Sequence, residues 1–191
     1  MKNCIKPIAV TLRGKPKLII GLGNPDKEYE KTYHNVGFLF IDYITKNPQT
    51  ASILNSQSLI LKSKVYMNES GGFVKKTAKQ NNAKPEELLI IHDDSDIKMG
   101  EYKLSFGRSS AGHRGVQSVI DSLKTKNFWR FRIGIGHGPT RTPHGLVRKK
   151  ASEIVLKKIS KADMETLNKI FKEFALCQVV KTRHKLAPQK K

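Results

Sequence analysis

The sequence is poor in cysteine, poor in acidic residues and free of long apolar runs. Cys4 and Cys177 are its two cysteines among 191 residues, and they form no C-x-x-C motif. This count indicates neither a disulfide framework nor a zinc site. No apolar run approaches the roughly 20 residues that a membrane-spanning helix needs. We therefore expect a globular protein of a reducing compartment, with no membrane partner.

The shortage of acids leaves a strongly basic chain. Thirty-six Lys and Arg residues face sixteen Asp and Glu, a net charge of +20. From Lys103 to Lys150, eleven basic residues accompany one acid, Asp121. Neutralising phosphates releases counterions and supplies affinity, so nucleic acid is the expected partner. A solvated basic surface without a partner is the alternative, and no strongly amphipathic basic helix points to an anionic membrane.

The length predicts one folded domain with a real core. We expect a basic N-terminal extension over residues 1–16, the domain over 17–181 and a basic C-terminal tail over 182–191. Residues 1–17 carry five basic residues and no acid. They indicate either a remnant of mitochondrial targeting or a basic arm. The expected location is accordingly mitochondrial or cytoplasmic, with the mitochondrion favoured.

Strand and helix patterns follow one another along the chain, which predicts an α/β fold. Apolar runs predict strands over 18–20, 59–66, 88–91, 101–106 and 129–135. Helical spacing predicts helices from Tyr33, after an N-cap at Ser70, over Val116–Leu123, and after a capping box of Ser160 and Asp163. The basic segment 137–150 is expected to be a loop, and a lid is one function that such a loop could have.

Polar side chains gather where the predicted strands end, the place where open α/β folds bind ligands. Asn24 follows the first strand in GLGNPD, and Asn68 follows the strand over 59–66. GLGNPD half-matches the dinucleotide motif G-x-G-x-x-G, but Asp26 replaces the third glycine and Pro25 removes a backbone donor. We reject that motif. A cap explains one asparagine, whereas two at neighbouring strand ends favour amide recognition.

The acids after the strand over 88–91 allow two chemistries. Asp93, Asp94 and Asp96 offer oxygen ligands for a hard divalent cation, although no second acidic cluster completes the shell. Alternatively, one carboxylate orients a histidine that activates water, and His34 is the candidate. A solvated turn is the remaining possibility.

Short motifs spread over the chain resemble the bacterial-type peptidyl-tRNA hydrolases. They are GLGNP, TYHNVG after Tyr29, YMNESG, HDD, GHRG and RIGIG, and they follow the family's order from Lys17 onward. The resemblance implies a single α/β domain, a twisted mixed β-sheet flanked by α-helices, and a monomer. It implies hydrolysis of the ester between a peptide and the 3′-terminal ribose of tRNA, which recycles tRNA, with no cofactor and no metal.

The resemblance also implies residue roles. His34 matches the catalytic histidine, Asp93 the acid that orients it, and Asn24 the residue that separates blocked from free aminoacyl groups. The positions that match contacts to the peptidyl-tRNA end are Tyr29, Tyr66 and Asn68. From charge and position we add the candidate phosphate contacts Lys103 and Arg132.

Three departures from the family pattern indicate a divergent member and are consistent with an organellar one. Arg114 stands where the family has an asparagine, Tyr33 where it has an arginine, and the segment before Met67 is short. We expect Arg114 to bind substrate by clamping a phosphate. Two alternatives stay open: a non-catalytic RNA-binding relative, and a metal-dependent phosphoesterase using Asp93–Asp96.

Overall fold

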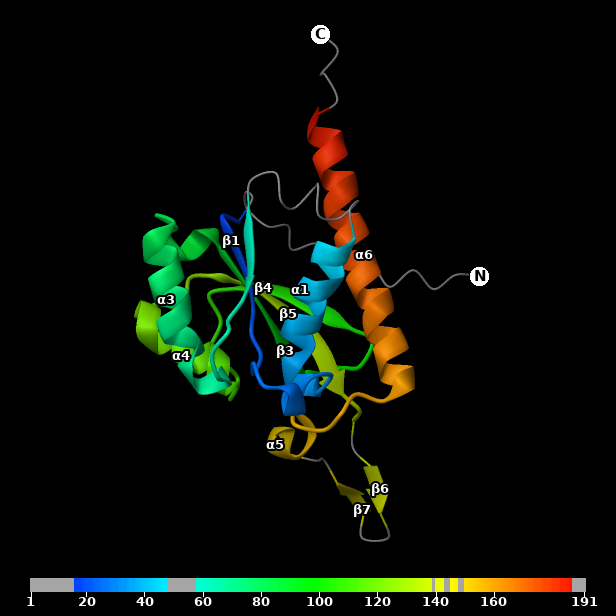
Figure 1. Cartoon of the computed structure of the whole chain (residues 1–191). Helices are drawn as coiled ribbons and strands as arrows, with labels where there is room; N and C mark the ends of the chain where they lie inside the picture. Colours follow the sequence, from blue (N-terminus) through cyan, green and yellow to red (C-terminus); the bar gives the residue numbers. More distant parts are fainter. Residues whose placement is uncertain (1–15, 48–57, 139, 143–144, 148–149, 187–191) are drawn as a thin grey trace.

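A computed structural model of the chain describes residues 16–47, 58–138, 140–142, 145–147 and 150–186 (Figure 1). The expected N-terminal extension lies outside the described residues except for Pro16. The same holds for the end of the expected C-terminal tail, beyond Leu186, and for residues 48–57 of the first long loop. No helix in the described part of the chain is long and apolar enough to cross a membrane.

A five-stranded mixed sheet forms the centre of the fold, with the strand order β2-β1-β3-β5-β4. Four strands run parallel and β4 runs antiparallel to β5 at the edge. The strands are β1 (Leu18–Gly21), β2 (Leu59–Lys62), β3 (Leu88–Lys98), β4 (Tyr102–Phe106) and β5 (Trp129–Gly136). This confirms the expected α/β fold with a mixed sheet.

Helices cover both faces of the sheet, α3 and α4 on one face and α1 and α6 on the other (Figure 1). The helices are α1 (Val36–Lys46), α3 (Ser70–Gln80), α4 (Arg114–Leu123), α5 (Ala151–Ile154) and α6 (Lys161–Leu186). Short 3-10 turns precede three elements, namely Tyr33–Asn35 before α1, Met67–Glu69 before α3 and Pro85–Glu87 before β3. Because α6 continues through Leu186, it reaches into the segment assigned to the tail.

Each helical layer buries its own apolar cluster against the sheet. On the α1 and α6 face, Phe131 and Phe174 stack with ring centroids 3.9 Å apart, and Phe40 packs edge-on against both. On the other face, Val74 of α3 and Val116 of α4 are fully buried against β1 and β3. The apolar stripe predicted for α6 therefore belongs to the core.

Two expected elements differ in length, and one expected cap is wrong. β2 ends at Lys62, four residues early, whereas β3 continues through the acids to Lys98 because it pairs with β5 as far as Asp94 and again at Lys98. Ser70 is the first residue of α3 and not its N-cap; its Oγ is buried without a partner in the described part of the chain.

The segment after β5 also departs from the expected loop. It contains a two-stranded hairpin, β6 (Thr140–Thr142) and β7 (Gly145–Val147), which projects away from the sheet (Figure 1). The capping box before α6 is confirmed in one half, since the Asp163 N–H donates to Ser160 Oγ over 3.1 Å. The Asp163 carboxylate accepts the Ser160 hydroxyl over 2.8 Å, which differs from the backbone N–H that a capping box uses.

Two glycines bring the start of α1 against the sheet. A Cβ on Gly37 would lie 2.4 Å from the carbonyl oxygen of Leu22 and 2.5 Å from that of Ile91. A Cβ on Gly21 would lie 2.5 Å from the carbonyl oxygen of Gly37. Only hydrogens fit at these distances, so the turn that carries His34 lies directly beside the ends of β1 and β3.

Candidate active site

A cavity of about 640 Å³ opens at the carboxyl ends of β1 and β3. Asn24 comes from the loop after β1, and Asp93 lies on β3, two residues past the last pair between these strands, Gly21 and Ile91. This is the edge of the sheet where the sequence predicts a ligand. The wall combines residues from β3, from the 107–113 loop, from the start of α4, from the 3-10 turns and from α5, whereas none of the described residues of α1, α3 or α6 lines it.

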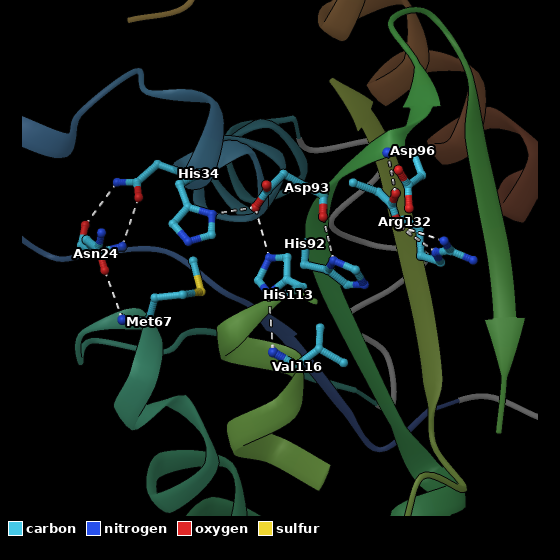
Figure 2. Close-up of polar contacts among 11 residues, drawn as sticks. Asn24, His34, Met67, His92, Asp93, Asp96, His113, Val116 and Arg132 are labelled. Carbon is cyan, nitrogen blue, oxygen red and sulfur yellow. Dashed lines mark hydrogen bonds and ion pairs between the residues drawn. The ribbon is translucent and has the colours of Figure 1, made fainter. Parts of the chain in front are cut away.

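His34 and Asp93 are in direct contact in this cavity (Figure 2). His34 Nδ1 lies 2.8 Å from Asp93 Oδ1, although 59 residues separate the two along the chain. Asp93 is 2% exposed, whereas the His34 side chain is 12% exposed and lines the cavity. The geometry is that of a buried carboxylate which orients an accessible imidazole.

A second histidine, His113, contacts the same carboxylate oxygen. Its Nε2 lies 3.0 Å from Asp93 Oδ1, while its Nδ1 accepts the backbone N–H of Val116 over 3.2 Å and so caps α4 (Figure 2). An accepting Nδ1 assigns the proton of a neutral His113 to Nε2, which then donates to Asp93. Helix α4 thereby fixes one of the two donors that hold the carboxylate.

The ionised state of Asp93 follows from these contacts. Burial alone would raise the pKa of its carboxyl, but the charge interactions and hydrogen bonds with His113 and His34 outweigh burial and hold the pKa far below its usual range. An ionised Asp93 only accepts, so His34 donates through Nδ1. The basic nitrogen of His34 is then Nε2, on the side of the ring away from Asp93.

The donor atoms of His34, Asp93 and His113 all lie within 4.8 Å of one another, and they are the one such group in the described part of the chain. A metal here would need a lone pair on His113 Nε2. In a neutral imidazole whose Nε2 binds a metal, the ring proton sits on Nδ1. In His113 that N–H would point at the backbone N–H of Val116, which donates to Nδ1, so two donors would face each other. The contacts fit a carboxylate that accepts two N–H groups better than a metal site.

The acids Asp94 and Asp96 do not join Asp93. The Asp94 carboxylate pairs with Arg132: Asp94 Oδ2 lies 2.7 Å from both Nε and Nη2 of the guanidinium. Asp94 Oδ1 accepts the backbone N–H of Asp96 over 2.9 Å. Both Asp93 and Asp94 line the cavity, but their carboxylates have different partners, since His34 and His113 bind Asp93 whereas Arg132 and the Asp96 N–H bind Asp94. This arrangement removes the three-carboxylate cluster that a metal-dependent phosphoesterase would need.

Asn24 is held in one orientation by three hydrogen bonds. Its side-chain Oδ1 accepts the backbone N–H of Met67 over 2.9 Å, and its own backbone exchanges two bonds of 2.8 and 2.9 Å with the Asn35 amide (Figure 2). With Oδ1 engaged by a donor, the NH₂ group is the part of the amide available to a ligand. Asn24 is therefore a fixed hydrogen-bond donor at the cavity wall.

The other residues expected at the peptidyl-tRNA end also line this cavity. Tyr66 is exposed and its hydroxyl donates to the carboxylate of Asp26. Arg114, the first residue of α4, is exposed at the N-terminus of that helix. The sequence-predicted residues that the cavity brings together are Asn24, Tyr29, His34, Tyr66, Asn68, Asp93 and Arg114.

The two expected phosphate contacts lie elsewhere. Lys103 on β4 and Arg132 on β5 are cross-strand neighbours near the edge of the sheet, and neither lines the cavity. Arg132 is not a free cation, because Asp94 binds its guanidinium at two nitrogens. Arg132 nevertheless borders the cavity through Asp94, which lines it.

Three contributors were not assigned roles from the sequence. His113 lies in the quoted GHRG motif, beside Arg114, but nothing in its sequence context shows that it reaches Asp93. Asn35 adjoins His34 and is fully engaged with the backbone of Asn24. Met67 contributes its backbone N–H, for which no sequence signal exists.

An α/β fold whose cavity holds an oriented imidazole and a fixed amide has the groups that a hydrolase needs to activate water. Comparison with known proteins gives the family. Residues 18–189 match the model of the peptidyl-tRNA hydrolase family, so the chain belongs to that family.

Individual relatives agree along most of the chain. The peptidyl-tRNA hydrolase of Thermodesulfovibrio yellowstonii is 44% identical over 136 residues, which cover 64% of this chain and 73% of that protein. The enzyme of Persephonella marina is 36% identical over 179 residues, covering 84% and 88%. The crystal structure of the Acinetobacter baumannii peptidyl-tRNA hydrolase superposes with a TM-score of 0.74 at 27% identity, covering 90% and 91%.

Proposed function

We propose that this protein hydrolyses the ester that joins a peptide to the 3′-terminal ribose of tRNA, with His34 as the general base. The carrying observation is the 2.8 Å contact between His34 and the ionised, buried Asp93 in a cavity that also holds the Asn24 amide. Membership of the peptidyl-tRNA hydrolase family supports the same reaction.

The proposed first step forms a tetrahedral intermediate. His34 Nε2 takes a proton from a water molecule while the water oxygen attacks the ester carbonyl carbon. The imidazolium that results is stabilised by Asp93, whose negative charge lies in a buried, weakly screened position. The carbonyl oxygen becomes an oxyanion and needs a donor already in place. The Asn24 NH₂ group is the candidate, because its orientation is fixed before substrate arrives.

The proposed second step releases the tRNA. The bond between the carbonyl carbon and the ribose oxygen breaks, and the His34 imidazolium returns its proton to that oxygen. The products are a peptide with a free carboxyl group and a tRNA with its 3′-terminal hydroxyl restored. No group on the protein is consumed, so a shuttle of one proton through His34 completes the cycle.

The Asn24 amide also supplies a basis for distinguishing peptidyl-tRNA from aminoacyl-tRNA. Blocking the α-amino group converts it into an amide whose carbonyl oxygen accepts a hydrogen bond from an NH₂ group. A free α-ammonium group only donates and would meet the Asn24 donor unfavourably. Asn68, Tyr29 and Tyr66 complete the proposed contacts to this end of the substrate.

The basic stretch from Lys103 to Lys150 is proposed to bind the tRNA body. Lys103 is exposed on β4, beside Arg132 on β5. Lys103 presents its charge at the sheet edge, whereas Asp94 neutralises part of the charge of Arg132. Phosphate contacts of this kind supply affinity and no chemistry.

The two alternative functions are separated by direct assays. A non-catalytic RNA-binding relative would bind tRNA and leave the ester intact. A metal-dependent phosphoesterase would lose activity after treatment with a chelator, whereas the proposed mechanism predicts that activity is retained. A minimal ester substrate is used for this assay, because it contains no folded tRNA.

We further propose that the protein acts as a monomer in the mitochondrion or the cytoplasm. The family resemblance supports the monomer, and the five basic residues without an acid in residues 1–17 support the mitochondrion. Sedimentation of the purified chain tests the first, and imaging of a chain tagged at its C-terminus tests the second.

The direct test of the function compares two substrates. Purified protein is incubated with an N-blocked peptidyl-tRNA and with the matching free aminoacyl-tRNA. We expect fast release of the peptide and slow release of the free amino acid. Equal rates would contradict the role given to Asn24, and no release of either would favour the binding-only alternative.

A further inference from the structure

His34 projects from a 3-10 turn of three residues, Tyr33–Asn35, between a loop and α1. A turn of this length has no ladder of backbone hydrogen bonds that would hold it rigidly. A general base must nevertheless stay within hydrogen-bond reach of both its carboxylate and the reacting water. Contacts outside the turn have to supply that rigidity.

The side chain of Tyr33 makes such a contact with α6. Tyr33 is 6% exposed, and its hydroxyl donates to Asp163 Oδ2 over 2.5 Å across a sequence separation of 130 residues. Asp163 lies in the first turn of α6. The same Oδ2 atom accepts from Ser160 Oγ at 2.8 Å and contacts His137 Nε2 at 3.0 Å, so two further side chains hold the carboxylate.

The protonation states agree with a lasting bond. Burial and the bond to Asp163 raise the pKa of the Tyr33 hydroxyl, which keeps it a donor at neutral pH. Burial alone would raise the pKa of the Asp163 carboxyl, but its bonds to Tyr33, Ser160 and His137 lower it overall. A neutral phenol thus donates to an ionised carboxylate, the stronger kind of hydrogen bond.

The backbone of the turn is tied to the same region. The Tyr33 N–H donates to the carbonyl of Lys157 over 3.1 Å, and the His34 N–H donates to the carbonyl of Val155 over 2.7 Å. Val155 lines the cavity. The side-chain bond to Asp163 and these two backbone bonds therefore fasten the turn to one continuous segment, residues 155–163.

We propose that Tyr33 is a positioning residue for the reaction: by binding Asp163 it fixes the turn that carries His34, and so holds the imidazole against Asp93. This inference rests on the proposed role of His34 as the base. The α6 helix, which does not line the cavity, acquires through Tyr33 a direct part in placing the catalytic histidine.

The test removes the hydroxyl and keeps the ring. Tyr33→Phe should lower kcat for peptidyl-tRNA roughly three- to tenfold and leave KM within about twofold, since small misplacements of a reacting group cost rate more than binding. The acidic limb of the pH–rate profile should move to lower pH, because an imidazolium held less closely by Asp93 loses its proton more readily. Asp163→Asn should give the same pattern.

A matched control and a double variant complete the design. Tyr43→Phe removes the hydroxyl of another partly buried tyrosine, whose ring packs against Phe171 of the same helix at a centroid distance of 5.7 Å. It should leave kcat and the pH profile unchanged. The double variant, Tyr33→Phe with Asp163→Asn, should be no slower than the slower single variant, since each single change already removes the same hydrogen bond between Tyr33 and Asp163.

Two outcomes would overturn the inference. If Tyr33→Phe lowers only the thermal unfolding midpoint, with kcat and the pH profile unchanged, Tyr33 is a fold anchor. If the two single variants multiply in the double variant, they act independently. His34→Ala tests the proposed function by itself. If His34→Ala is inactive and one of these two results is found, the positioning role of Tyr33 is wrong and the proposed function stands.

Discussion

Asp93 Oδ1 accepts hydrogen bonds from two histidines, and the nearer of them, His34, lies 2.8 Å away, which leaves its second ring nitrogen on the side of the ring away from the carboxylate. The farther one, His113, is fixed by the N-terminus of α4. The carboxylate is therefore satisfied on one side by a structural histidine and on the other by the proposed base. Because the two histidines have different roles, mutation can separate the effect of each residue on the reaction rate.

Replacing the Asp93 carboxylate by an amide should slow the reaction without removing it. Asp93→Asn keeps the shape but ends the charge that stabilises the His34 imidazolium, and its NH₂ group offers a donor where the histidines need an acceptor. We expect kcat to fall by about 10- to 100-fold, less than the loss from His34→Ala, with tRNA affinity within about twofold. Single-turnover hydrolysis and a separate binding titration measure the two effects. A large loss of binding with kcat preserved would contradict this role.

The stability of the protein should carry the signature of a carboxyl whose pKa is lowered on folding. The folded pKa of Asp93 lies below its unfolded value of about 3.9. The stabilisation is then complete above that unfolded value and is lost as the pH falls further toward the folded pKa. Urea unfolding of the parent chain should weaken more steeply below about pH 4 than that of Asp93→Asn. Parallel curves for the two proteins would show that Asp93 is not ionised in the folded state.

Most of the fold could be predicted from the sequence, because it depends on local patterns. The apolar runs that became β1 and β5 and the helical stripe of α6 are periodic signals that need no partner to be recognised. The length of β3 could not be predicted in this way. Its acids looked like a turn, and they extend the strand because β5 is there to pair with them.

The residues of the site also differ in how far the sequence predicts them. Side chains that act by chemical type, such as His34 and Asp93, stand out in a sequence at the ends of predicted elements. Contacts that depend on tertiary placement do not: the bond from His113 to Asp93, the backbone N–H of Met67 on Asn24, and the pairing of Arg132 with Asp94. Tyr33 looked like a simple departure from the family until its partner Asp163, 130 residues away, was known.

Charge removal at the sheet edge should weaken binding in a salt-dependent way. Lys103→Gln should raise KM for peptidyl-tRNA and lower the slope of log K against log salt by about one, as expected for a lost phosphate contact. Arg132→Gln should change both in the same direction but by less, because Asp94 already binds the guanidinium. Lys172→Gln, on the exposed side of α6, is the matched control and should change neither. Unchanged slopes in both edge variants would place the tRNA on another surface.

The guanidinium of Arg114 should bind a phosphate near the acceptor end of the tRNA. It only donates hydrogen bonds and carries a fixed charge, so it cannot accept from the ribose or the peptide as an amide would. It is exposed at the first residue of α4, where backbone N–H groups add to an anion site. Arg114→Ala should weaken tRNA-containing substrates several-fold more than a minimal ester without phosphates.

Arg114→Asn compares the two solutions directly, since it restores the amide and removes the charge. If parent, Ala and Asn chains give equal kinetics on both substrates, Arg114 points to solvent and takes no part in binding.

The assignment of His34 as the base is tested most directly by single-turnover hydrolysis of peptidyl-tRNA with His34→Ala, at enzyme in excess over substrate. Circular dichroism and the unfolding midpoint confirm that the variant is folded, and Thr45→Ala, near the far end of α1, serves as the control. Loss of a general base costs about 10²–10⁴-fold, so we predict a loss in that range for His34→Ala, with tRNA binding retained and Thr45→Ala at the parent rate. A folded His34→Ala that cleaves peptidyl-tRNA at near the parent rate would contradict the mechanism.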